Sequence, residues 1–427
     1  MKKKLQIIAL LLFQFAFSQN VNIPDSNFKA ALISKNVDTN ADGEISNAEA
    51  QAISYLEMSS KNINSLTGIE AFTNLTTLYF SYNNVSTVDL SALTNLQVLS
   101  CSNNKLTALN VSANANLTSI NGMYNLITTM DVTHNLALEV LSIASNQIPS
   151  IDLSKNTNLI SLTISQNKLS TLDVTKNTKL VGLFCDFNNL TQLDVTKNTL
   201  LVGLNCASNN LTVLDVTQTT KLNNLSCQAN GLSSLDLTKN TELTSVRCNS
   251  NQITALNLDN CTKLTTLLCH FNKLASLDIN KNILLNTLSC TNNVLTYLNL
   301  ANGNNTGIIQ MLAGNNSTLT CIKIDADYTP GTGWNKDATA SYNTACPLMD
   351  TDEVSRSEII IQNPIEKELT YSSKEKIDKI DVYSVDGKLV KSVKNNNRSM
   401  LSFSAGMYFA KIYFHNGKVI TKKLVKK

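Results

Sequence analysis

Histidine is scarce in this sequence of 427 residues, which contains three. His134 and His415 stand alone, and His270 has no serine, cysteine or glutamate arranged around it as a catalytic triad requires. Because acid–base catalysis most often uses histidine, the shortage argues against an enzyme. We therefore expect no catalytic residue and no organic cofactor.

Long apolar runs and excess charge are also missing. After the first 18 residues there is no run of about 18 apolar residues, the length that a transmembrane helix needs. The formal net charge is +3, and residues 351–427 hold a positive surplus of 15 Lys and Arg over 9 Asp and Glu. The sequence therefore predicts no transmembrane segment and no nucleic-acid-binding surface.

The first residues form an export signal. Three lysines, Lys2 to Lys4, precede an apolar run from Leu5 to Phe17, and the small residues Ala16 and Ser18 occupy the positions that signal peptidase reads. This pattern predicts a secretory signal peptide over residues 1–18. The mature chain would begin near Gln19 and be exported across the inner membrane.

A column of asparagines repeats every 21 residues without a slip. Each follows a short alternation of apolar or small residues, as Asn188 follows Leu183 and Cys185. A fixed period of this length indicates a solenoid, in which each repeat forms one coil. The eleven members, which we call the ladder asparagines, are Asn83, Asn104, Asn125, Asn146, Asn167, Asn188, Asn209, Asn230, Asn251, Asn272 and Asn293.

Over residues 63–300 the repeat resembles the leucine-rich repeat, with cysteine in its third apolar position. The alternation of Leu183 and Cys185 predicts a short strand with one buried face. Stacked copies would form a parallel sheet on the concave face, with short turns or strands on the convex face. We expect each ladder amide to hydrogen-bond backbone groups of its own coil and of the next coil.

A second column has Asp or Asn six residues after every ladder asparagine. A row of carboxylates could hold cations. Alternatively, each side chain could cap the turn that follows it by accepting a backbone N–H bond. The capping interpretation is favoured because three members, Asn110, Asn257 and Asn299, are neutral.

Seven of the ten cysteines stand three residues before a ladder asparagine. They are Cys101, Cys185, Cys206, Cys227, Cys248, Cys269 and Cys290. Neighbouring strands lie about 4.8 Å apart with parallel side chains, whereas a disulfide needs side chains that converge. We expect buried free thiols, in a cysteine ladder that resembles the one in a subset of internalin-like repeats. Cys261 falls in the column occupied by Asn177, Asn198 and Asn240, which predicts a lone turn residue. Cys321 and Cys346 are predicted to form a disulfide that closes the C-terminal cap.

Residues 38–49 resemble the twelve-residue EF-hand calcium loop, with Gly43 at the sharp sixth position. The resemblance implies ligands from Asp38, Asn40, Asp42, the Glu44 carbonyl, Ser46 directly or through water, and a bidentate Glu49. The flanks predict short helices over residues 24–34 and 47–58. We expect residues 19–62 to form a helical N-terminal cap braced by structural calcium. The alternative is an Asp- and Asn-rich turn that binds no metal.

The period fails after Leu300, which predicts a C-terminal cap over residues 301–346 and a polar linker over 347–357. Residues 358–427 alternate strand-like runs with the turns Asp386-Gly387 and Asn416-Gly417, a pattern typical of hairpins in a small β-sandwich. With Asn363-Pro364 and Ser404 to Tyr408, they resemble the C-terminal sorting domain of type IX secretion. That resemblance implies export by the type IX machinery, followed by release or anchoring at the outer cell surface. A carbohydrate-binding or structural sandwich is the alternative.

The exposed strand positions lie one, two, four and six residues before each ladder asparagine, and most carry Ser, Thr, Asn, Gly or Ala. The departures are Tyr79, Tyr82, Met123, Tyr124, Phe184, Asp186, Phe187, Arg247, Leu268, His270 and Phe271. Aromatic residues with Arg typically anchor protein interfaces, and aromatics above a hydroxyl- and amide-rich surface suit sugars equally well. Glycoside hydrolysis would need two facing carboxylates, and Asp186 stands almost alone.

Together these features predict a non-catalytic protein, secreted or held at the cell surface. Its concave face would bind a protein or a glycan partner, in adhesion or another interaction. The alternatives are a structural surface-layer or self-assembling component and a carbohydrate-processing accessory protein.

Overall fold

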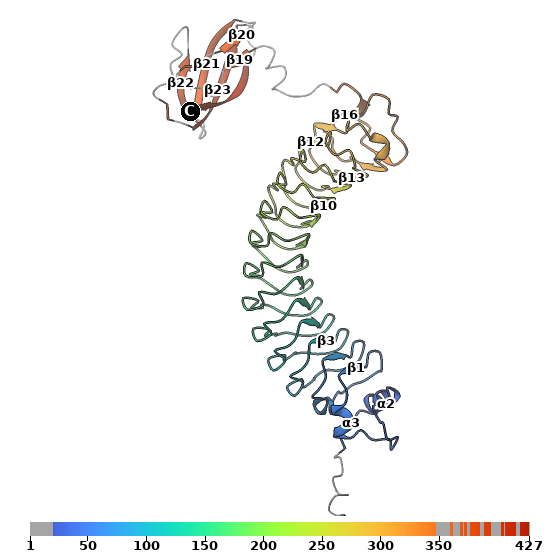
Figure 1. Ribbon diagram of the computed structural model, residues 1–427. Helices are drawn as coiled ribbons and strands as arrows, with labels where there is room; N and C mark the ends of the chain where they lie inside the picture. The colour runs from blue at the N-terminus through green and yellow to red at the C-terminus, as the bar shows by residue number, and fades with distance from the viewer. Residues whose placement is uncertain are drawn as a thin grey trace, which may run out of the picture. The chain divides into compact units, whose positions relative to one another are not determined.

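A computed structural model describes residues 20–346 and, nearer the C-terminus, 359–361, 368–369, 371–373, 376–384, 388–393, 403–404, 406–415 and 419–426. The predicted signal peptide (1–18) and linker (347–357) lie outside the described residues. The chain divides into two compact units between Ala345 and Cys346. The first unit is a curved solenoid of stacked coils, and the second is a small antiparallel β unit (Figure 1).

The N-terminal cap contains two helices. Helix α2 spans Ser26–Ser34, and α3 spans Asn47–Gln51. The helix predicted over 47–58 is therefore wrong beyond Gln51, because strand β1 (Tyr55–Glu57) follows and pairs in parallel with β2 (Thr77–Tyr79). Leu56 is buried between two outward-facing residues, and β1 is therefore the first strand of the solenoid sheet.

The main sheet has fourteen parallel strands in the order β1–β11, β13, β15, β17, and they line the inner side of the curve (Figure 1). Each strand buries its central apolar residue under the sheet. After β1 and β2 come β3 Val98–Ser100, β4 Ser119–Asn121, β5 Val140–Ser142, β6 Ser161–Thr163, β7 Gly182–Phe184, β8 Gly203–Asn205, β9 Asn224–Ser226, β10 Ser245–Arg247, β11 Thr266–Leu268, β13 Thr287–Ser289, β15 Gln310–Leu312 and β17 Trp334–Asn335. The sheet thus extends beyond residues 63–300 at both ends.

A second parallel sheet forms in the C-terminal coils. Its strands are β12 Ser276–Asp278, β14 Tyr297–Asn299, β16 Cys321–Lys323 and β18 Ser341–Asn343. Short 3₁₀ turns occur at Ile69–Ala71 (η1) and Asn305–Gly307 (η2). Near the end of this unit, the Trp334 indole donates to the Ile308 carbonyl at 2.8 Å and packs against Tyr328 and Tyr342. This aromatic cluster covers the last apolar edge of the solenoid.

The ladder asparagines tie neighbouring coils together. The Nδ2 of Asn188 donates to the carbonyl oxygens of Cys185 in its own coil (3.1 Å) and of Ile164 in the preceding coil (3.0 Å). Its Oδ1 accepts from the Leu169 amide, also in the preceding coil, at 3.0 Å. The partner coil is thus the preceding one, so the expectation of bonds to the next coil is wrong. Asn316 extends the ladder by a twelfth member, beyond the regular 21-residue spacing.

A second ladder of buried asparagines runs parallel to the first. Asn177 is fully buried, and its Nδ2 donates to the carbonyl oxygens of Leu153 (3.1 Å) and Asn156 (2.8 Å). The other members are Asn114, Asn135, Asn156, Asn198, Asn240 and Asn282, with Thr219 and Cys261 in the remaining places. Cys261 occupies the predicted place in the column of Asn177, Asn198 and Asn240, where it is buried and its Sγ contacts the Leu237 and Asn240 carbonyls at 3.8 Å.

The cysteine ladder is buried and reduced, as predicted. All seven ladder thiols and Cys261 are free and buried, whereas Cys321 and Cys346 are disulfide-bonded. Burial disfavours the charged thiolate and raises the pKa of Cys206 and Cys248 to about 12. The ladder thiols are core residues without nucleophilic character at neutral pH.

The second unit has a two-stranded sheet of β19 (Ile359–Ile361) and β20 (Tyr371–Ser373) and a four-stranded antiparallel sheet. The strands of the larger sheet, in spatial order, are β22 Leu389–Val393, β21 Ile377–Ser384, β23 Gly406–Phe414 and β24 Val419–Lys426. Ile380, Val382 and Phe414 belong to its own apolar core. The turns Asp386-Gly387 and Asn416-Gly417 and the pair Asn363-Pro364 lie outside the described residues. Among the helices that the structure describes, none has the length and hydrophobicity of a membrane span.

Candidate functional site

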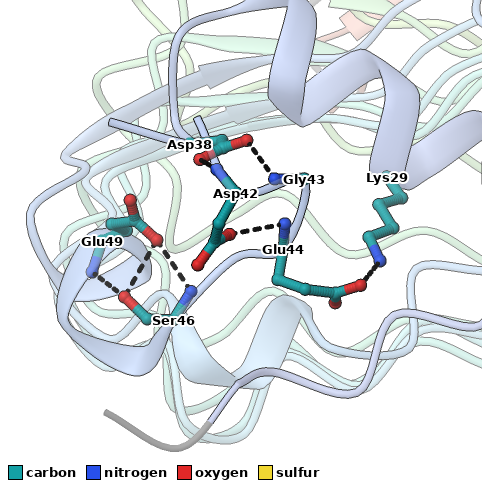
Figure 2. Close-up of polar contacts among 7 residues, drawn as sticks. All are labelled: Lys29, Asp38, Asp42, Gly43, Glu44, Ser46 and Glu49. Carbon is teal, nitrogen blue, oxygen red and sulfur yellow. Dashed lines mark hydrogen bonds and ion pairs between the residues drawn. The ribbon is translucent and has the colours of Figure 1, made fainter. Parts of the chain in front are cut away.

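The loop of residues 38–49 folds around its own acidic side chains (Figure 2). The Asp38 carboxylate accepts from the amides of Asp42 (3.2 Å) and Gly43 (2.9 Å), and Asp42 accepts from the amide of Glu44 at 2.8 Å. Gly43 has a φ of 82°, the left-handed conformation that glycine adopts without strain. The sharp turn expected at the sixth loop position is therefore present.

Glu49 lies at the start of α3, where it forms a reciprocal capping box with Ser46. One carboxylate oxygen accepts from the Thr39 amide (2.7 Å) and hydroxyl (2.8 Å), and the other accepts from the Ser46 amide and hydroxyl (both 2.9 Å). The hydrogen bonds from the Ser46 backbone and the Thr39 side chain lower the pKa of Glu49 to about 2. The side chain is therefore a carboxylate at neutral pH.

The side chains of the other predicted ligands point in different directions. Glu44 turns its carboxylate away from the loop to pair with Lys29 of α2, which suits a residue expected to offer only its backbone carbonyl (Figure 2). Asn40 accepts from the Asp42 amide at 2.9 Å. Among the described residues, no three His, Cys, Asp or Glu side chains converge as a metal-binding group. The carboxylates of Asp38, Asp42 and Glu49 thus share a loop without meeting at one point.

The N-terminal segment pairs with this loop. Asn20 forms an antiparallel bridge with Ser46, and the Val21 amide donates to the carbonyl of the buried Ile45 at 2.8 Å. EF-hand loops ordinarily occur in pairs, and the sequence offers no second loop. Residues 20–21 instead pair with the end of this loop through one isolated bridge and the Val21 bond.

The second column of Asp and Asn caps turns. Asp194 accepts from the Thr196 amide at 2.9 Å and from the Thr196 hydroxyl at 2.7 Å, and these bonds lower its pKa. The equivalent bond to the residue two positions later recurs along the column, as at Asp131 and Asn257. The capping interpretation is therefore confirmed.

The candidate partner-binding residues occupy three columns of the main sheet. Tyr79, Phe184, Arg247 and Leu268 end their strands, Met123, Asp186 and His270 follow two residues later, and Tyr82, Tyr124, Phe187 and Phe271 come one residue after that. The last group is the most exposed, at 62, 54, 56 and 54%. These four aromatic side chains face solvent at the edge of the strand column.

The column of these four aromatics has a left-handed backbone. Phe187 and Phe271 both have a φ of 52°, and the residue immediately before every ladder asparagine lies between 51° and 56°. For residues other than glycine this conformation costs about 1–2 kcal/mol, and asparagine tolerates it best. Other coils have Asn103 or Asn292 at this position. Bulky aromatic residues are a poor local choice there.

The structure separates the candidates into three groups. Tyr79 and Tyr82 lie on one coil near the N-terminus, with Met123 and Tyr124 two coils further on. Phe184, Asp186 and Phe187 lie on another coil, and Arg247 pairs in register with Leu268 beside His270 and Phe271. Tyr55 belongs with the first group, since its ring meets Tyr79 edge-to-face at 5.8 Å and is largely exposed. The sequence reading missed it because β1 precedes the regular period.

Two polar candidates have particular surroundings. Asp186 accepts a hydrogen bond from the Ser165 hydroxyl of the preceding coil. Partial burial lowers the pKa of His270, so its imidazole is neutral at neutral pH, and its Nδ1 has no hydrogen-bond partner among the described residues. His270 instead contacts the Phe271 ring edge-to-face.

Comparisons with known proteins agree with this architecture. Residues 73–116 match the family model for leucine-rich repeats, and residues 361–427 match the model of the secretion system C-terminal sorting domain. No curated protein matches the chain significantly.

Three solved structures share the solenoid. The functional domain of InlJ from Listeria monocytogenes, described as including a cysteine ladder, is 26% identical and aligns over 96% of this chain and 98% of its own, with a TM-score of 0.62. An internalin from the same species, InlF, is 23% identical over 77% of this chain and 99% of its own, with a TM-score of 0.60. The protein LIC12759 from Leptospira interrogans is 17% identical over 73% and 98%, with a TM-score of 0.54.

The 21-residue coils, the ladder of buried thiols and the separate C-terminal β unit now have counterparts in known families. The chain is built of leucine-rich repeats, has internalins among its structural neighbours and ends in a type IX secretion sorting domain.

Proposed function

We propose that this protein is a non-catalytic interaction protein, secreted or held at the outer cell surface, whose concave face binds a protein or glycan partner. The observation that carries the proposal is the set of exposed aromatic residues in the left-handed column, Tyr82, Tyr124, Phe187 and Phe271. The sorting domain supports the location, because it directs the chain to secretion.

The conformational cost of these four aromatic residues favours a role in binding rather than in folding. A residue that lowers the stability of its own turn, and whose ring then faces water, contributes nothing evident to the fold. Large rigid side chains with few rotatable bonds are suited to anchoring a partner at low entropic cost. Their spacing over a rigid sheet would let one partner contact several of them.

The repeat itself provides the test of this proposal. Replacing Tyr124, Phe187 and Phe271 with asparagine, the residue that other coils carry at this position, should raise the free energy of unfolding slightly, because asparagine tolerates the left-handed backbone. The same changes should weaken adhesion to cells or extracellular matrix by roughly tenfold or more. Solid-phase binding and thermal unfolding of the purified chain measure the two effects.

Replacement of Leu136 with alanine is the matched control, since Leu136 is 56% exposed on a turn outside the strand columns. Adhesion that survives the three asparagine replacements, in a protein that remains folded, would refute binding through this face.

We also propose that the loop of residues 38–49 binds one structural calcium ion. Asp38, Asn40 and Asp42 would supply side-chain oxygens, Glu44 its carbonyl, and Ser46 and Glu49 the remainder. No lysine or arginine pairs with Asp38 or Asp42 within the described residues, so the loop has uncompensated negative charge. Calcium would compete with the Thr39 and Ser46 bonds for the Glu49 carboxylate.

Titration calorimetry of the chelator-treated protein with calcium should give one site per chain. Saturating calcium should raise the melting temperature, because a ligand that binds only the folded state stabilises it. Changing Asp38 or Asp42 to alanine should abolish the heat, whereas Asp259→Asn, on an exposed residue outside the cap, should leave it unchanged. Stoichiometric binding by the Asp38 and Asp42 variants would place the ion elsewhere.

A further inference from the structure

The Phe184 ring lies on the concave face, in space left by two glycines that have no side chain. A Cβ atom built on Gly182, in the same strand, would lie 3.1 Å from Cε2 of the Phe184 ring, and one on Gly203, in β8, would lie 3.7 Å from Cζ. Gly182 and Gly203 pair directly in register. The outer edge of the ring therefore folds back over the space that two missing side chains leave.

The two glycines lower the stability of their strands but allow the Phe184 ring to lie close to the sheet. Glycine weakens a strand by roughly 0.5–1 kcal/mol relative to alanine, and within a strand it often marks a close approach. Among the eleven ladder coils, only these two have glycine six residues before the asparagine. The pair seats Phe184 against the sheet as a fixed platform, with the ring 37% exposed.

Arg247 lies three coils further along in the same column. Its guanidinium has no ion pair or hydrogen bond within the described part of the chain, and it stands in register between Ser226 and Leu268. The nearest acid in the strand columns is Asp186, roughly 14 Å away by the strand spacing. Arg247 is thus an isolated cation on a face that is otherwise nearly neutral.

The coils between these features have short or amide side chains. Strands β8 and β9 and the residues after them present Asn205, Asn224, Ser226 and Gln228 at least partly exposed, and Ala207 is buried. Low polar side chains thus lie between the coil of Phe184 and Phe187 and the two successive coils that carry Arg247 and Phe271. From Phe187 to Phe271 the stretch covers four coil spacings, or roughly 19 Å.

We propose that this stretch, which we call the Phe184–Phe271 floor, binds a glycan chain that carries a carboxylate, with a sugar ring stacked on Phe184 and the carboxylate at Arg247. This rests on the proposed function, since it names the partner of the same face. The negative face of an aromatic ring attracts polarised C–H groups such as those of a sugar ring. Neutral hydroxyl and amide groups suit sugar hydroxyls, and a guanidinium binds a carboxylate through two parallel hydrogen bonds.

A protein partner fits the floor less well. Protein interfaces are anchored by side chains that fill pockets in the partner, whereas Phe184 is folded onto its own sheet. The backbone groups of the central strands are already paired with neighbouring strands, so an added peptide strand has no edge to join at this face. A glycan chain needs neither a pocket-filling side chain nor a free strand edge, because it can stack on the Phe184 ring and hydrogen-bond through its hydroxyl groups.

The test uses the full chain and two sets of immobilised probes. One set contains alginate, pectate and hyaluronate oligosaccharides of increasing length, and the other contains the same oligosaccharides after their carboxyl groups are reduced to alcohols. At least one acidic series should bind roughly tenfold tighter than its reduced counterpart, with a preference that falls as salt rises. Affinity should increase with length until the chain spans the four coils.

Two variants assign the contacts. Arg247→Gln should remove the preference for the acidic series and leave binding of the reduced series unchanged. Gly182→Ala should weaken both series, because the new methyl group must displace the Phe184 ring. Gly122→Ala is the matched control, since a Cβ at Gly122 makes ordinary contacts of 3.7 Å and lies away from this ring.

The outcomes separate the two proposals. Absence of binding to all the acidic oligosaccharides, while adhesion still depends on Tyr124, Phe187 and Phe271, overturns the glycan proposal and leaves the proposed function intact. Acidic preference that persists in Arg247→Gln also overturns it. Adhesion independent of all these aromatics removes both proposals.

Discussion

Replacing the ladder residue Asn188 with alanine should destabilise the solenoid by roughly 2–6 kcal/mol. The change leaves the Leu169 amide without a partner, at a cost of about 1–3 kcal/mol. It also removes one of two donors to each of the Ile164 and Cys185 carbonyls, which keep Asn167 and Asn209, and each lost bond costs about 0.5–1.5 kcal/mol. Chemical denaturation, with hydrogen exchange to locate the loss, would measure the effect. We expect the loss to concentrate in neighbouring coils, because each repeat contacts only its neighbours.

The adjacent residue provides the control. Asn189 is exposed, and its side chain forms no hydrogen bond with any residue that the structure describes, so Asn189→Ala should change stability by no more than about 0.5 kcal/mol. Asn188→Asp makes a second comparison, since it keeps the shape and the acceptor for Leu169 but replaces the donor with a charged oxygen facing two carbonyls. Equal stability of Asn188→Ala and Asn189→Ala would show that the ladder contributes little.

Removing residues 361–427 should abolish export to the outer surface in a bacterium that has type IX secretion. These residues match the sorting domain and fold around their own core, which the solenoid residues do not share. A receptor-read signal acts as an address, so its loss should leave the solenoid folded but retained inside the outer membrane. Cell fractionation with immunodetection, and protease accessibility on intact cells, would measure the distribution.

A reporter fusion is the reciprocal control. Residues 347–427 attached to an unrelated exported protein should carry that protein to the surface. Surface display of the truncated chain at the level of the full chain would mean that the export information lies in the solenoid.

The regular parts of the fold could be predicted because one physical pattern repeats. The strand, the ladder asparagine, the inward cysteine and the turn-capping aspartate recur at fixed offsets, so a single coil such as 180–200 describes most of the solenoid. The second asparagine ladder was equally periodic, but Thr219 and Cys261 interrupt it. Its buried position follows from packing between coils, which sequence alone did not resolve.

The irregular parts depended on contacts that no local pattern encodes. Residues 55–57 have a helix-like neighbourhood, yet they form β1 because β2 offers an edge to pair with. The left-handed column also lacks a local signature, since Tyr82, Gln166 and Phe187 are not residues that favour this conformation. Its geometry is imposed by the turn into the ladder asparagine, and it became visible only when neighbouring coils were in place.

For the loop of residues 38–49, the sequence predicted the turn at Gly43, but not the use of the Glu49 carboxylate as a helix cap. It also gave no indication that residues 20–21 pair with the loop. The Glu49 cap involves the end of the loop and the start of α3, and residues 20–21 lie outside the twelve-residue motif.

Because eight free thiols are buried in the folded protein, it matters whether the chain folds before or after its cysteines meet an oxidant. Once the coils are stacked, no oxidant reaches these sulfur atoms and none ionises readily, so the folded protein can keep reduced cysteines in an oxidising surrounding. The unfolded chain has ten cysteines of ordinary reactivity and many possible pairings. On the proposed export route, folding therefore competes with oxidation in the periplasm. A chain that stacks its coils too slowly would be trapped by mispaired cysteines that the native fold does not contain.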